Sequence, residues 1–595
     1  MKGDTRNMFR KLLGYVKQYK KPALLTPAFA AIEVVMEVLI PFVTAMLIDK
    51  GIDAGNMGEI LKYGGLMLLL ALASLATGVL AGRYAATAAS GFSANLRDAM
   101  YTNIQTFSFS NIDKFSTAGL ITRMTTDVNN LQNAFSMCIR IAVRAPMTLI
   151  SSIVMCFVIN HELSLIFVGA MAVLAVVLSL IVRKAMKLFS ETFRKYDDLN
   201  ASVQENISAI RVVKAFVREE HESEKFSKAA NALYRLFVKA ESVIAFNGPV
   251  MMLVIYTCMI LLSWFGAQFI VSDILSTGEL TSLFSYVMSA MGSLMMLSMI
   301  FVMLTMSMAS GRRICEVLDE KADLQNPDHP VTDVADGSID FDNVSFTYKT
   351  GTGEPTLRGI TLHINSGETV GIIGGTGSGK SSLVNLISRL YDVSEGSVSV
   401  GGVDVRRYDM EELRNQVAVV LQKNVLFSGS IIDNLRWGKE DATLEECREA
   451  CAQACATEFI ERMPDGYNTH IEQGGANVSG GQKQRLCIAR ALMKKPRVLI
   501  LDDSTSAVDT ATDAKIREAF AKKIPGTTKL IIAQRISSVQ HADRILVLEN
   551  GEVNGFDTHE NLLATNEIYR EIYETQTQGG GDFDEPTADR EEAAQ

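Results

Sequence analysis

The fold of the second half of this 595-residue chain is decided by the stretch Thr369-Val-Gly-Ile-Ile-Gly374-Gly-Thr-Gly-Ser-Gly-Lys380-Ser381. It runs from an apolar strand through a glycine-rich turn into a helix, which is the full pattern of a nucleotide phosphate-binding loop. The glycines let backbone N–H groups turn inward around a β-phosphate, and the N-terminus of the following helix adds a favourable dipole. We therefore expect ATP to be bound by Gly374, Gly375, Thr376, Gly377, Ser378, Gly379, Lys380, Ser381 and Ser382.

Three residues at this loop are expected to handle the charge of the nucleotide and of its metal ion. Lys380 should reach the β- and γ-phosphates, and Ser381 should ligate Mg²⁺. A second apolar strand, Val498-Leu-Ile-Leu-Asp502, ends in a carboxylate that would hold the same ion through water. The two patterns together predict an α/β domain that binds ATP and Mg²⁺.

The first half of the chain is instead made of long apolar runs. A helix needs about 20 mostly apolar residues to cross the ~30 Å hydrocarbon core of a membrane. The third of the six runs described below, 145–159, is shorter than this length, and we expect that span to begin a few residues earlier. The net charge of -10 and the lack of a basic tract argue against a nucleic-acid partner. Six stretches qualify as spans, namely 23–48, 64–82, 145–159, 163–182, 243–270 and 280–308.

The distribution of basic residues between the spans predicts their orientation. The links after the first, third and fifth spans are short, and Lys50 and Lys62 are their only Lys or Arg. The links 83–144 and 183–242 are long and rich in both residues. The positive-inside rule therefore predicts a multi-pass protein of the cytoplasmic membrane, in contact with its lipids, with both termini and both long links in the cytoplasm.

The two long links are informative in themselves. Their apolar residues recur at helical spacing, with few Gly or Pro. This pattern predicts that the spanning helices continue well into the cytoplasm and turn back near 111–119 and 208–216. A turn held far below the bilayer can contact a soluble domain, so each link is interpreted as a mechanical arm.

Two features inside the spans have alternative interpretations. Glu33 and Glu37 lie four residues apart, on one helix face, and carboxylates at membrane depth usually face an aqueous cavity or a partner. They would either help to bind cationic cargo or pair with Arg or backbone groups. The last span carries eight methionines, among them Met295 and Met299. Their thioethers suit a substrate cavity for varied apolar compounds and suit plain helix packing in lipid equally well.

Three shorter segments carry simpler predictions. Cys447, Cys451 and Cys455 recur every four residues and are interpreted as core residues, because a metal site needs closer ligand spacing. The basic, acid-poor N-terminus is expected to form a helix on the membrane surface. The acid-rich tail beyond Gln576 is expected to be disordered.

Between the two nucleotide motifs lies Val478-Ser479-Gly480-Gly481-Gln482, and with it the whole chain resembles the type IV ABC exporters. The resemblance implies that Tyr348 stacks on adenine and that Gln422 contacts Mg²⁺ and the membrane arms. It also implies that 506–509 is the D-loop. Residues 115–119 and 204–216 resemble the family's coupling segments. In that family two halves dimerise head to tail, and each ATP lies between one phosphate loop and the other chain's signature helix, here Ser479, Gly480, Gly481 and Gln482.

Three positions depart from the family pattern. The general base, a Glu in the family, is Asp503, and the switch histidine is Gln534. The usual Gly-Glu-Arg-Gly before the signature reads Glu472-Gln473-Gly474-Gly475. Asp is about 1.5 Å shorter than Glu, and Gln can donate a hydrogen bond but cannot become a cation. These changes resemble the hydrolysis-impaired subunit of a heterodimeric bacterial multidrug exporter.

The sequence thus predicts a membrane α-helical bundle of six transmembrane helices with long cytoplasmic extensions, fused to an α/β P-loop ABC ATPase domain. The expected parts are a transmembrane domain (1–310), a linker (311–337), a nucleotide-binding domain (338–576) and a tail (577–595). The expected function is ATP-driven export of small amphipathic compounds, with a second half-transporter that carries an intact catalytic Glu as partner. The alternatives are a homodimeric exporter of lipid or peptide and, disfavoured by the few basic residues in the spans, an ATP-gated channel or regulator.

Overall fold

The computed structural model describes residues 2–348, 353–503 and 510–578 of the chain. It divides into two compact units, and the division does not follow the order of the sequence. The first unit comprises Met1–Gln105 and Thr117–Glu320, and the second comprises Thr106–Ser116 and Lys321–Gln595. A short segment from the first half of the chain is therefore built into the second unit.

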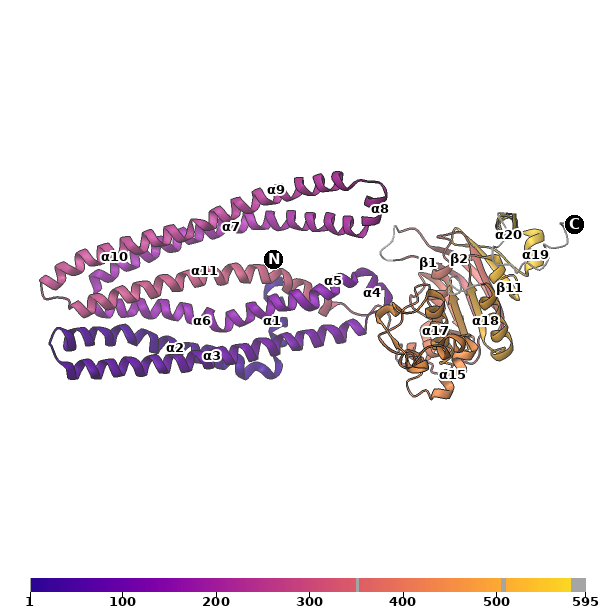
Figure 1. The fold of residues 1–595 in the computed structure, drawn as a ribbon, viewed down its shortest axis with the longest axis horizontal. Helices are drawn as coiled ribbons and strands as arrows, with labels where there is room; N and C mark the ends of the chain where they lie inside the picture. Colours follow the sequence, from indigo (N-terminus) through magenta and orange to yellow (C-terminus); the bar gives the residue numbers. More distant parts are fainter. Residues whose placement is uncertain (1, 349–352, 504–509, 579–595) are drawn as a thin grey trace. The chain divides into compact units, whose positions relative to one another are not determined.

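Long helices make up the first unit (Figure 1). The two predicted turns are present, since short helices interrupt the chain between α3 and α6 and between α7 and α9, and their place in the cytoplasm stays a prediction. In the second turn the chain runs from α7 through α8 into α9, and α7 packs along α9. The helices of this unit are α1 (Lys2–Gly14), α2 (Lys20–Leu47), α3 (Met57–Gln105), α5 (Thr117–Thr122), α6 (Val128–Ile159), α7 (His161–Ser208), α8 (Ile210–Ala215), α9 (Glu219–Ala245), α10 (Asn247–Val271) and α11 (Thr277–Asp319).

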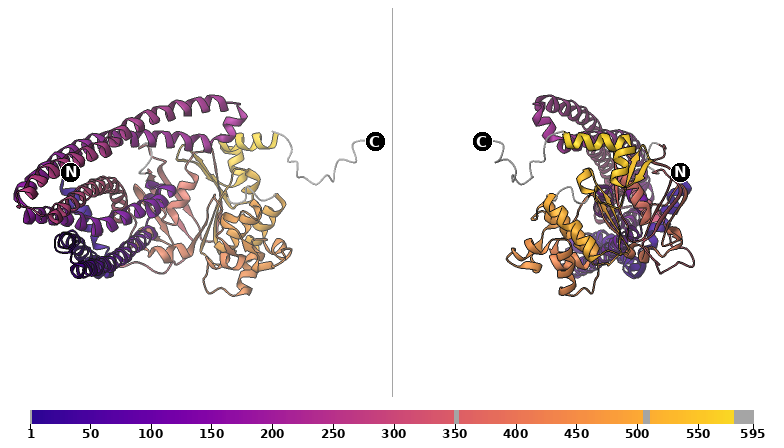
Figure 2. Two further views of the ribbon diagram at one scale, coloured as in Figure 1. Left: turned by 60° about the vertical axis from the view of Figure 1, so that its left-hand side comes forward. Right: turned by 90° about the vertical axis from the view of Figure 1, so that its right-hand side faces the viewer.

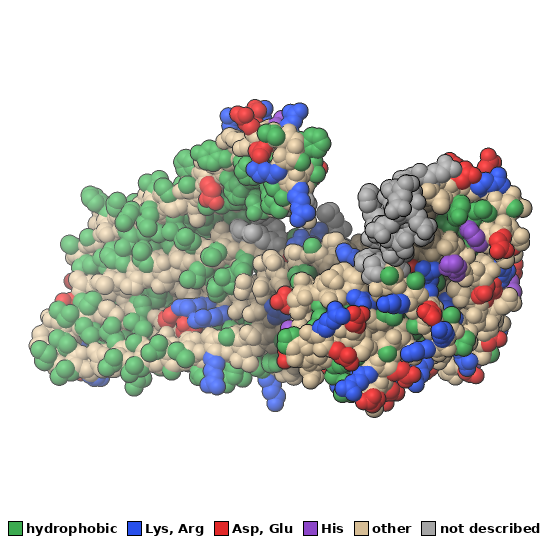
Figure 3. Space-filling view, turned by 45° about the vertical axis from the view of Figure 1, so that its right-hand side comes forward, with side chains coloured by type: hydrophobic (Ala, Val, Ile, Leu, Met, Phe, Trp, Pro, Cys, Tyr) green, Lys and Arg blue, Asp and Glu red, His purple; other side chains and the backbone are tan. Residues whose placement is uncertain are grey.

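Among the described residues, six helical stretches are long and apolar enough to cross a membrane, as the sequence predicted. Hydrophobic side chains cover much of the visible face of these helices, whereas charged side chains gather on the second unit (Figure 3). The third stretch begins earlier than residue 145, as expected. The six stretches are Lys17–Ile52, Met57–Gln105, Thr117–Ile159, His161–Phe189, Glu219–Val271 and Thr277–Ile300.

Two sheets organise the second unit. One has the order β2-β1-β4-β5 and is antiparallel. The other has the order β12-β11-β3-β10-β9-β6 and is parallel except for β12. The strands are β1 (Ile339–Phe346), β2 (Leu357–Ile364), β3 (Thr369–Gly374), β4 (Glu395–Val400), β5 (Val403–Asp404), β6 (Val417–Val420), β9 (Val498–Asp502), β10 (Thr528–Ile532), β11 (Arg544–Glu549) and β12 (Glu552–Asp557), with a small pair of β7 (Gly429–Ser430) and β8 (His470–Ile471).

Helices accompany these sheets, and α15 and α17 lie near each other in Figure 1. Cys447 and Cys451 are fully buried in the hydrophobic core and Cys455 packs against it, which confirms their interpretation as core residues. Figure 2 shows the same helices from two further sides. They are α4 (Phe109–Lys114), α12 (Lys380–Ile387), α13 (Met410–Gln416), α14 (Ile431–Arg436), α15 (Leu444–Gln453), α16 (Thr457–Glu461), α17 (Gly480–Leu492), α18 (Thr510–Lys523), α19 (His559–Thr565) and α20 (Glu567–Gln578).

The remaining predictions concern the two ends of the chain, the D-loop and the domain boundaries. The proposed D-loop, 506–509, and the tail beyond residue 578 lie outside the described residues. The N-terminal segment is helical, as expected, in α1. Its place on a membrane surface stays a prediction, as do the domain boundaries drawn from the sequence.

Candidate ATP site and signature helix

The phosphate loop follows β3, which lies in the interior of the larger sheet between β11 and β10. The strand ends at Gly374 and α12 begins at Lys380, so the loop opens at the carboxyl edge of parallel strands. Gly379 caps α12 with a φ of 94°, in the left-handed region. A side chain there would place its Cβ 2.7 Å from a Leu357 carbon and 3.1 Å from the Thr356 carbonyl oxygen. This position therefore requires glycine.

The Lys380 ammonium lies within the loop that it is expected to serve. Its Nζ donates to the carbonyl oxygens of Gly374 at 2.9 Å and Gly375 at 2.7 Å. Burial lowers the pKa of Lys380, while the nearby carboxylates of Asp502 and Asp503 act in the opposite direction. The lysine is thus a positive charge held beside two carboxylates, at the mouth of a helix N-terminus that also favours anions.

Ser381 and Asp502 form the predicted metal-binding pair. The Ser381 hydroxyl donates to Asp502 Oδ1 at 3.0 Å, and Asp502 ends the buried strand β9. Burial raises the pKa of Asp502, the Ser381 hydrogen bond lowers it, and the neighbouring charge of Asp503 raises it. A hydroxyl and a carboxylate are the hard oxygen donors that suit Mg²⁺.

The donor set also indicates how a metal would be held. Among the described residues no group of three or more His, Cys, Asp and Glu side chains could hold a metal ion. Mg²⁺ is commonly bound by one or two protein oxygens together with substrate phosphates. The Ser381 and Asp502 oxygens fit that kind of site, in which the nucleotide supplies the remaining ligands.

The two departures from the family pattern meet in space. Gln534 Nε2 donates to Asp503 Oδ2 at 2.8 Å. Asp503 follows β9 with a φ of 48°, and its amide donates to the Ile532 carbonyl oxygen at 3.1 Å. Because β9 and β10 are paired in parallel register, the residues that follow them come out side by side. The sequence marked both residues as unusual, and the structure adds that they are hydrogen-bonded to each other.

Tyr348, the predicted adenine-stacking residue, lies beside the phosphate loop. Its hydroxyl is 2.9 Å from Ser382 Oγ, a hydrogen-bond distance. Its ring packs edge-on against Phe346, with centroids 4.7 Å apart, and against Tyr391, with centroids 5.2 Å apart. Gln422 is exposed in the segment that follows β6. Both residues keep their roles from the family resemblance as predictions.

The signature segment begins a helix, as the sequence predicted. Ser479 caps α17, and its hydroxyl accepts from the Gln482 amide at 3.3 Å while Gln482 Oε1 accepts from the Ser479 amide at 3.0 Å. This reciprocal capping box fixes the start of the helix. Ser479 and Gly480 are both exposed. The helix N-terminus can therefore receive an anion from outside the domain.

The altered segment before the signature is attached to the same helix. Gly474 and Gly475 have φ values of 71° and 70°, and Lys483 of α17 donates to the Gly474 carbonyl oxygen at 2.7 Å. A Cβ at Gly475 would lie 2.8 Å from Lys483 Cε. The segment thus forms a tight turn that glycine makes possible.

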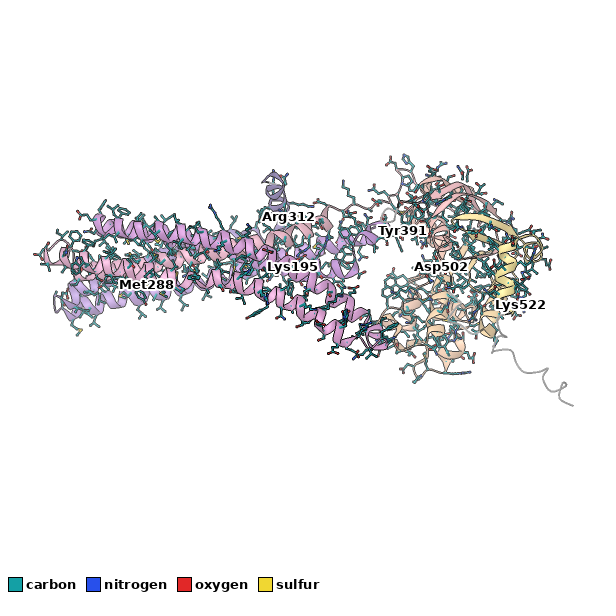
Figure 4. The ribbon with its side chains drawn as sticks, turned by 90° about the horizontal axis from the view of Figure 1, so that it is seen from above. Lys195, Met288, Arg312, Tyr391, Asp502 and Lys522 are labelled. Atoms are coloured by element: carbon teal, nitrogen blue, oxygen red, sulfur yellow. The ribbon has the colours of Figure 1, made fainter. Side chains whose placement is uncertain are left out.

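The turn between α3 and α6 includes α4, which is part of the second unit. The Tyr391 hydroxyl donates to Asp113 Oδ2 at 2.7 Å, and the ring packs edge-on against Phe109 with centroids 6.0 Å apart. Burial, and then the Asp113 hydrogen bond, raise the pKa of Tyr391. Phe109 also borders a cavity of about 420 Å³ that is lined by Leu421 and Lys423, on either side of Gln422. Figure 4 places Tyr391 and Asp502 on this unit.

The second turn, α8, lies in the first unit, so its predicted contact with an ATP-binding domain stays a prediction. It carries apolar side chains at its surface. Phe216 and Val217, which follow the helix, are 74% and 80% exposed. Both apolar side chains therefore lie at the surface of this turn.

In the membrane region, both carboxylates of α2 pair with an arginine of α6. Arg144 Nη1 lies 3.2 Å from Glu33 Oε1, and Arg144 Nη2 lies 2.7 Å from Glu37 Oε1. Of the two alternatives, pairing with Arg is therefore observed, and a role in binding cargo stays a prediction. Met295 and Met299 are 45% and 62% exposed in this chain, which is compatible with either interpretation.

Two residues of these sites were not predicted from the sequence. Arg144 had a signal, because it is a charged residue only one residue before an apolar run, with two carboxylates in another span. Tyr391 had none, because only the tertiary structure brings Asp113 of α4 to it across a sequence separation of 278 residues.

Comparisons with known proteins agree with this architecture. The family model of the ABC transporter transmembrane region matches residues 24–306, and that of the ABC transporter matches residues 357–506. An uncharacterized ABC transporter ATP-binding protein of Bacillus subtilis, YfiB, is 37% identical over 95% of this chain and 98% of its own. The Mycobacterium tuberculosis protein Rv1273c is 34% identical over 95% and 97%, and Bacillus subtilis YfiC is 30% identical over 96% and 95%. The chain belongs to the ABC transporter family, as a multi-pass membrane region and an ATP-binding domain in one polypeptide.

Proposed function

We propose that this chain is one subunit of a heterodimeric exporter that moves drugs or other amphipathic compounds outward across the cytoplasmic membrane. In this assembly its own ATP site hydrolyses slowly, and its signature helix completes the competent site of a second half-transporter. The observation that carries the proposal is the 2.8 Å hydrogen bond between Gln534 and Asp503, at the positions of the family's switch histidine and general base.

The geometry explains why this pair would be a poor catalyst. A general base must come within about 3.2 Å of the water that it deprotonates, and a misplacement of ~1 Å can cost on the order of 100-fold. Asp503 is shorter than Glu by about 1.5 Å. One of its carboxylate oxygens already accepts a hydrogen bond from Gln534. Gln534 cannot carry the positive charge that a histidine could offer to the γ-phosphate.

The binding parts of the site support retention of ATP. Lys380 donates to a carbonyl oxygen of the loop and Ser381 donates to Asp502, and these residue types are the ones that bind phosphate and Mg²⁺ in P-loop proteins. The exposed start of α17 at Ser479 has no change that would prevent it from contacting a nucleotide held by another chain. This combination favours a chain that binds ATP itself and assists hydrolysis in its partner.

The relatives are compatible with assembly from different chains. Bacillus subtilis alone has at least two proteins, YfiB and YfiC, that match this chain over 95% and 96% of its length. More than one half-transporter of this type can therefore exist in one cell. We propose that the partner of this chain is such a protein, with Glu directly after its strand aspartate.

The assembly is tested by expressing the chain alone and together with a half-transporter from a neighbouring gene. Alone, the purified chain should bind ATP but show little ATPase activity. Together, the two chains should purify in a one-to-one ratio and hydrolyse ATP at a rate typical of transporters. Rapid turnover by a pure homodimer would contradict the proposal and favour the homodimeric exporter instead.

A further inference from the structure

Three helices of the membrane region meet around charged groups that the ATP chemistry does not use. Glu33 and Glu37 project from one face of α2, and Arg144 of α6 bridges them, at 3.2 Å and 2.7 Å. Charged side chains at membrane depth are costly and generally mark a pathway or a binding site. We refer to Glu33, Glu37 and Arg144 as the α2–α6 charge cluster.

One carboxylate oxygen of the cluster accepts no hydrogen bond from the described residues. Glu33 as a whole residue is only 6% exposed, and its Oε2 atom is buried without a hydrogen-bond partner among the described residues. A buried acceptor that makes no hydrogen bond carries a desolvation cost, which is larger when the group is charged. Arg144 does not relieve this cost, because its Nη atoms contact Oε1 of Glu33 and Oε1 of Glu37 and not Oε2 of Glu33.

One glycine of α3 gives the cluster space that a second glycine on the same helix does not border. A Cβ at Gly78 would come within 2.9 Å of Glu33 Oε1 and 3.2 Å of its Cδ, so the absent side chain leaves room for the carboxylate. One turn later a Cβ at Gly82 would lie 3.7 Å from Arg140 Nη1, which is an ordinary contact. Arg140 lies one helical turn before Arg144 on α6, so a positive charge alone does not set the cluster apart from its surroundings. What sets it apart is the Glu33 oxygen that has no hydrogen-bond partner among the described residues.

The cluster is also accessible from one side. The Glu33 side chain is 7% exposed, whereas those of Glu37 and Arg144 are 35% and 28% exposed. A ligand would therefore reach Glu37 and Arg144 first and Glu33 last. Its positive end would meet two carboxylates, and an N–H group would satisfy the oxygen that now has no partner.

We propose that the α2–α6 charge cluster binds the cationic end of transported compounds, with Glu33 accepting a hydrogen bond from an amine or amidine group. The inference rests on the proposed function and names its substrate class, organic cations with an apolar body. An uncharged compound of similar size gains nothing from Glu33, and an anion is repelled by the two carboxylates.

The test measures equilibrium binding of two fluorescent probes to the full-length chain in lipid nanodiscs, together with any partner that co-purifies. Ethidium is an organic cation with amino groups, and N-phenyl-1-naphthylamine is an uncharged apolar dye. Glu33→Gln should weaken ethidium binding by about tenfold, because a charge-assisted hydrogen bond is lost. Binding of the uncharged dye should stay within about twofold of the original, as it does not use that bond.

Two glycine variants provide a matched comparison on one helix. Gly78→Ala pushes against the Glu33 carboxylate and should weaken ethidium binding, whereas Gly82→Ala meets only an ordinary contact and should not. Both changes favour the helix to the same degree. ATP binding in the same samples shows that the second unit is folded, and the far-ultraviolet circular dichroism of each variant should match that of the original chain if its membrane helices are intact.

The results separate the two proposals. If Glu33→Gln and Gly78→Ala leave ethidium binding unchanged, or weaken both dyes equally, the cation site is wrong. If the unchanged complex expels the uncharged dye with ATP but does not bind ethidium, the cation site is wrong and the exporter stands. If ethidium binds through Glu33 but neither dye moves with ATP, the exporter proposal is wrong and the site stands.

Discussion

The phosphate loop and the signature helix belong to the same domain, yet their polar groups are satisfied in opposite ways. At the loop, Lys380 is bonded to its own loop carbonyls and Ser381 to Asp502. At the signature, Ser479 and Gly480 are exposed at the start of α17, where the first amides of a helix have no intrahelical acceptor. The polar groups named at the loop are bonded within the chain, whereas Ser479 and Gly480 at the start of α17 are exposed to the surroundings of the domain.

A second difference lies in the chemistry that each region can perform. Beside the loop, the positions that should supply a base and a cation are occupied by Asp503 and Gln534, which bond to each other. The signature retains its capping box. Under the proposed function, the chain keeps the part of ATP hydrolysis that serves a partner and lacks part of what serves its own site. The following experiments test it, from the largest expected effect to the smallest.

Lys380→Ala should have the largest effect, on ATP binding at the chain's own site. The phosphates lose their cationic partner, and we expect the affinity for ATP to fall by about 100-fold, in keeping with the loss of a strong charge-assisted contact. Equilibrium binding of a fluorescent ATP analogue to the purified chain measures it. Lys522→Ala is the control, because Lys522 is paired with Glu518 on the exposed side of α18. Unchanged affinity in Lys380→Ala would mean that the loop is not the site.

Ser479→Arg should come next, with an effect on the ATPase activity of the complex and not on ATP binding by this chain. A bulky cation would block the N-terminus of α17, and we expect a loss on the order of 10- to 100-fold, the range for loss of electrostatic stabilisation. Thr443→Arg is a matched control, since Thr443 caps α15 with the same kind of capping box. If both variants lost similar ATPase activity, the loss in Ser479→Arg would be explained by a less stable helix and not by a blocked helix N-terminus.

The double change of Asp503→Glu and Gln534→His should increase hydrolysis at the chain's own site. It restores both the reach of the base and a side chain that can become a cation. We expect a gain of about tenfold, at the low end of general-base contributions. The measurement uses a complex in which the partner's site is inactivated. Asp503→Glu alone should gain less, and no gain from either variant would show that the two residues do not limit this site.

Asp503→Ala should have the smallest effect. Since little hydrolysis is expected at this site, the steady-state ATPase activity of the complex should change by less than about twofold. Its loss should be clearly smaller than that of Ser479→Arg measured in parallel. If Asp503→Ala silenced the complex while Ser479→Arg remained active, the roles of the two regions would have to be exchanged.

Much of the architecture could be predicted because the signals are local. Apolar runs longer than a bilayer is thick predict spans wherever they occur, and α3 and α11 illustrate this directly. The phosphate loop and the start of α17 depend on glycines and a capping pair within a few residues. These features do not require knowledge of any distant contact.

Contacts between distant segments could not be predicted in this way. The Glu33 and Glu37 carboxylates left two interpretations open, because the sequence does not say which helix faces α2. The structure supplies Arg144 from α6, and Gly78 from α3 as the space beside it. Likewise, the first cytoplasmic turn was expected to contact an ATP-binding domain, but Tyr391 as its partner emerged only from the fold.

The sequence by itself determined the six apolar spans, the ATP-binding motifs and the two unusual residues, because each depends on side chains that are neighbours along the chain. Only the tertiary structure decided that Gln534 bonds to Asp503, since two parallel strands must pair in register before the residues after them can meet. It also decided that Arg144 serves two carboxylates and leaves one buried oxygen of Glu33 without a partner among the described residues. The physical reason is the same in both cases: hydrogen bonds and ion pairs depend on distances of about 3 Å, which helix and strand packing sets.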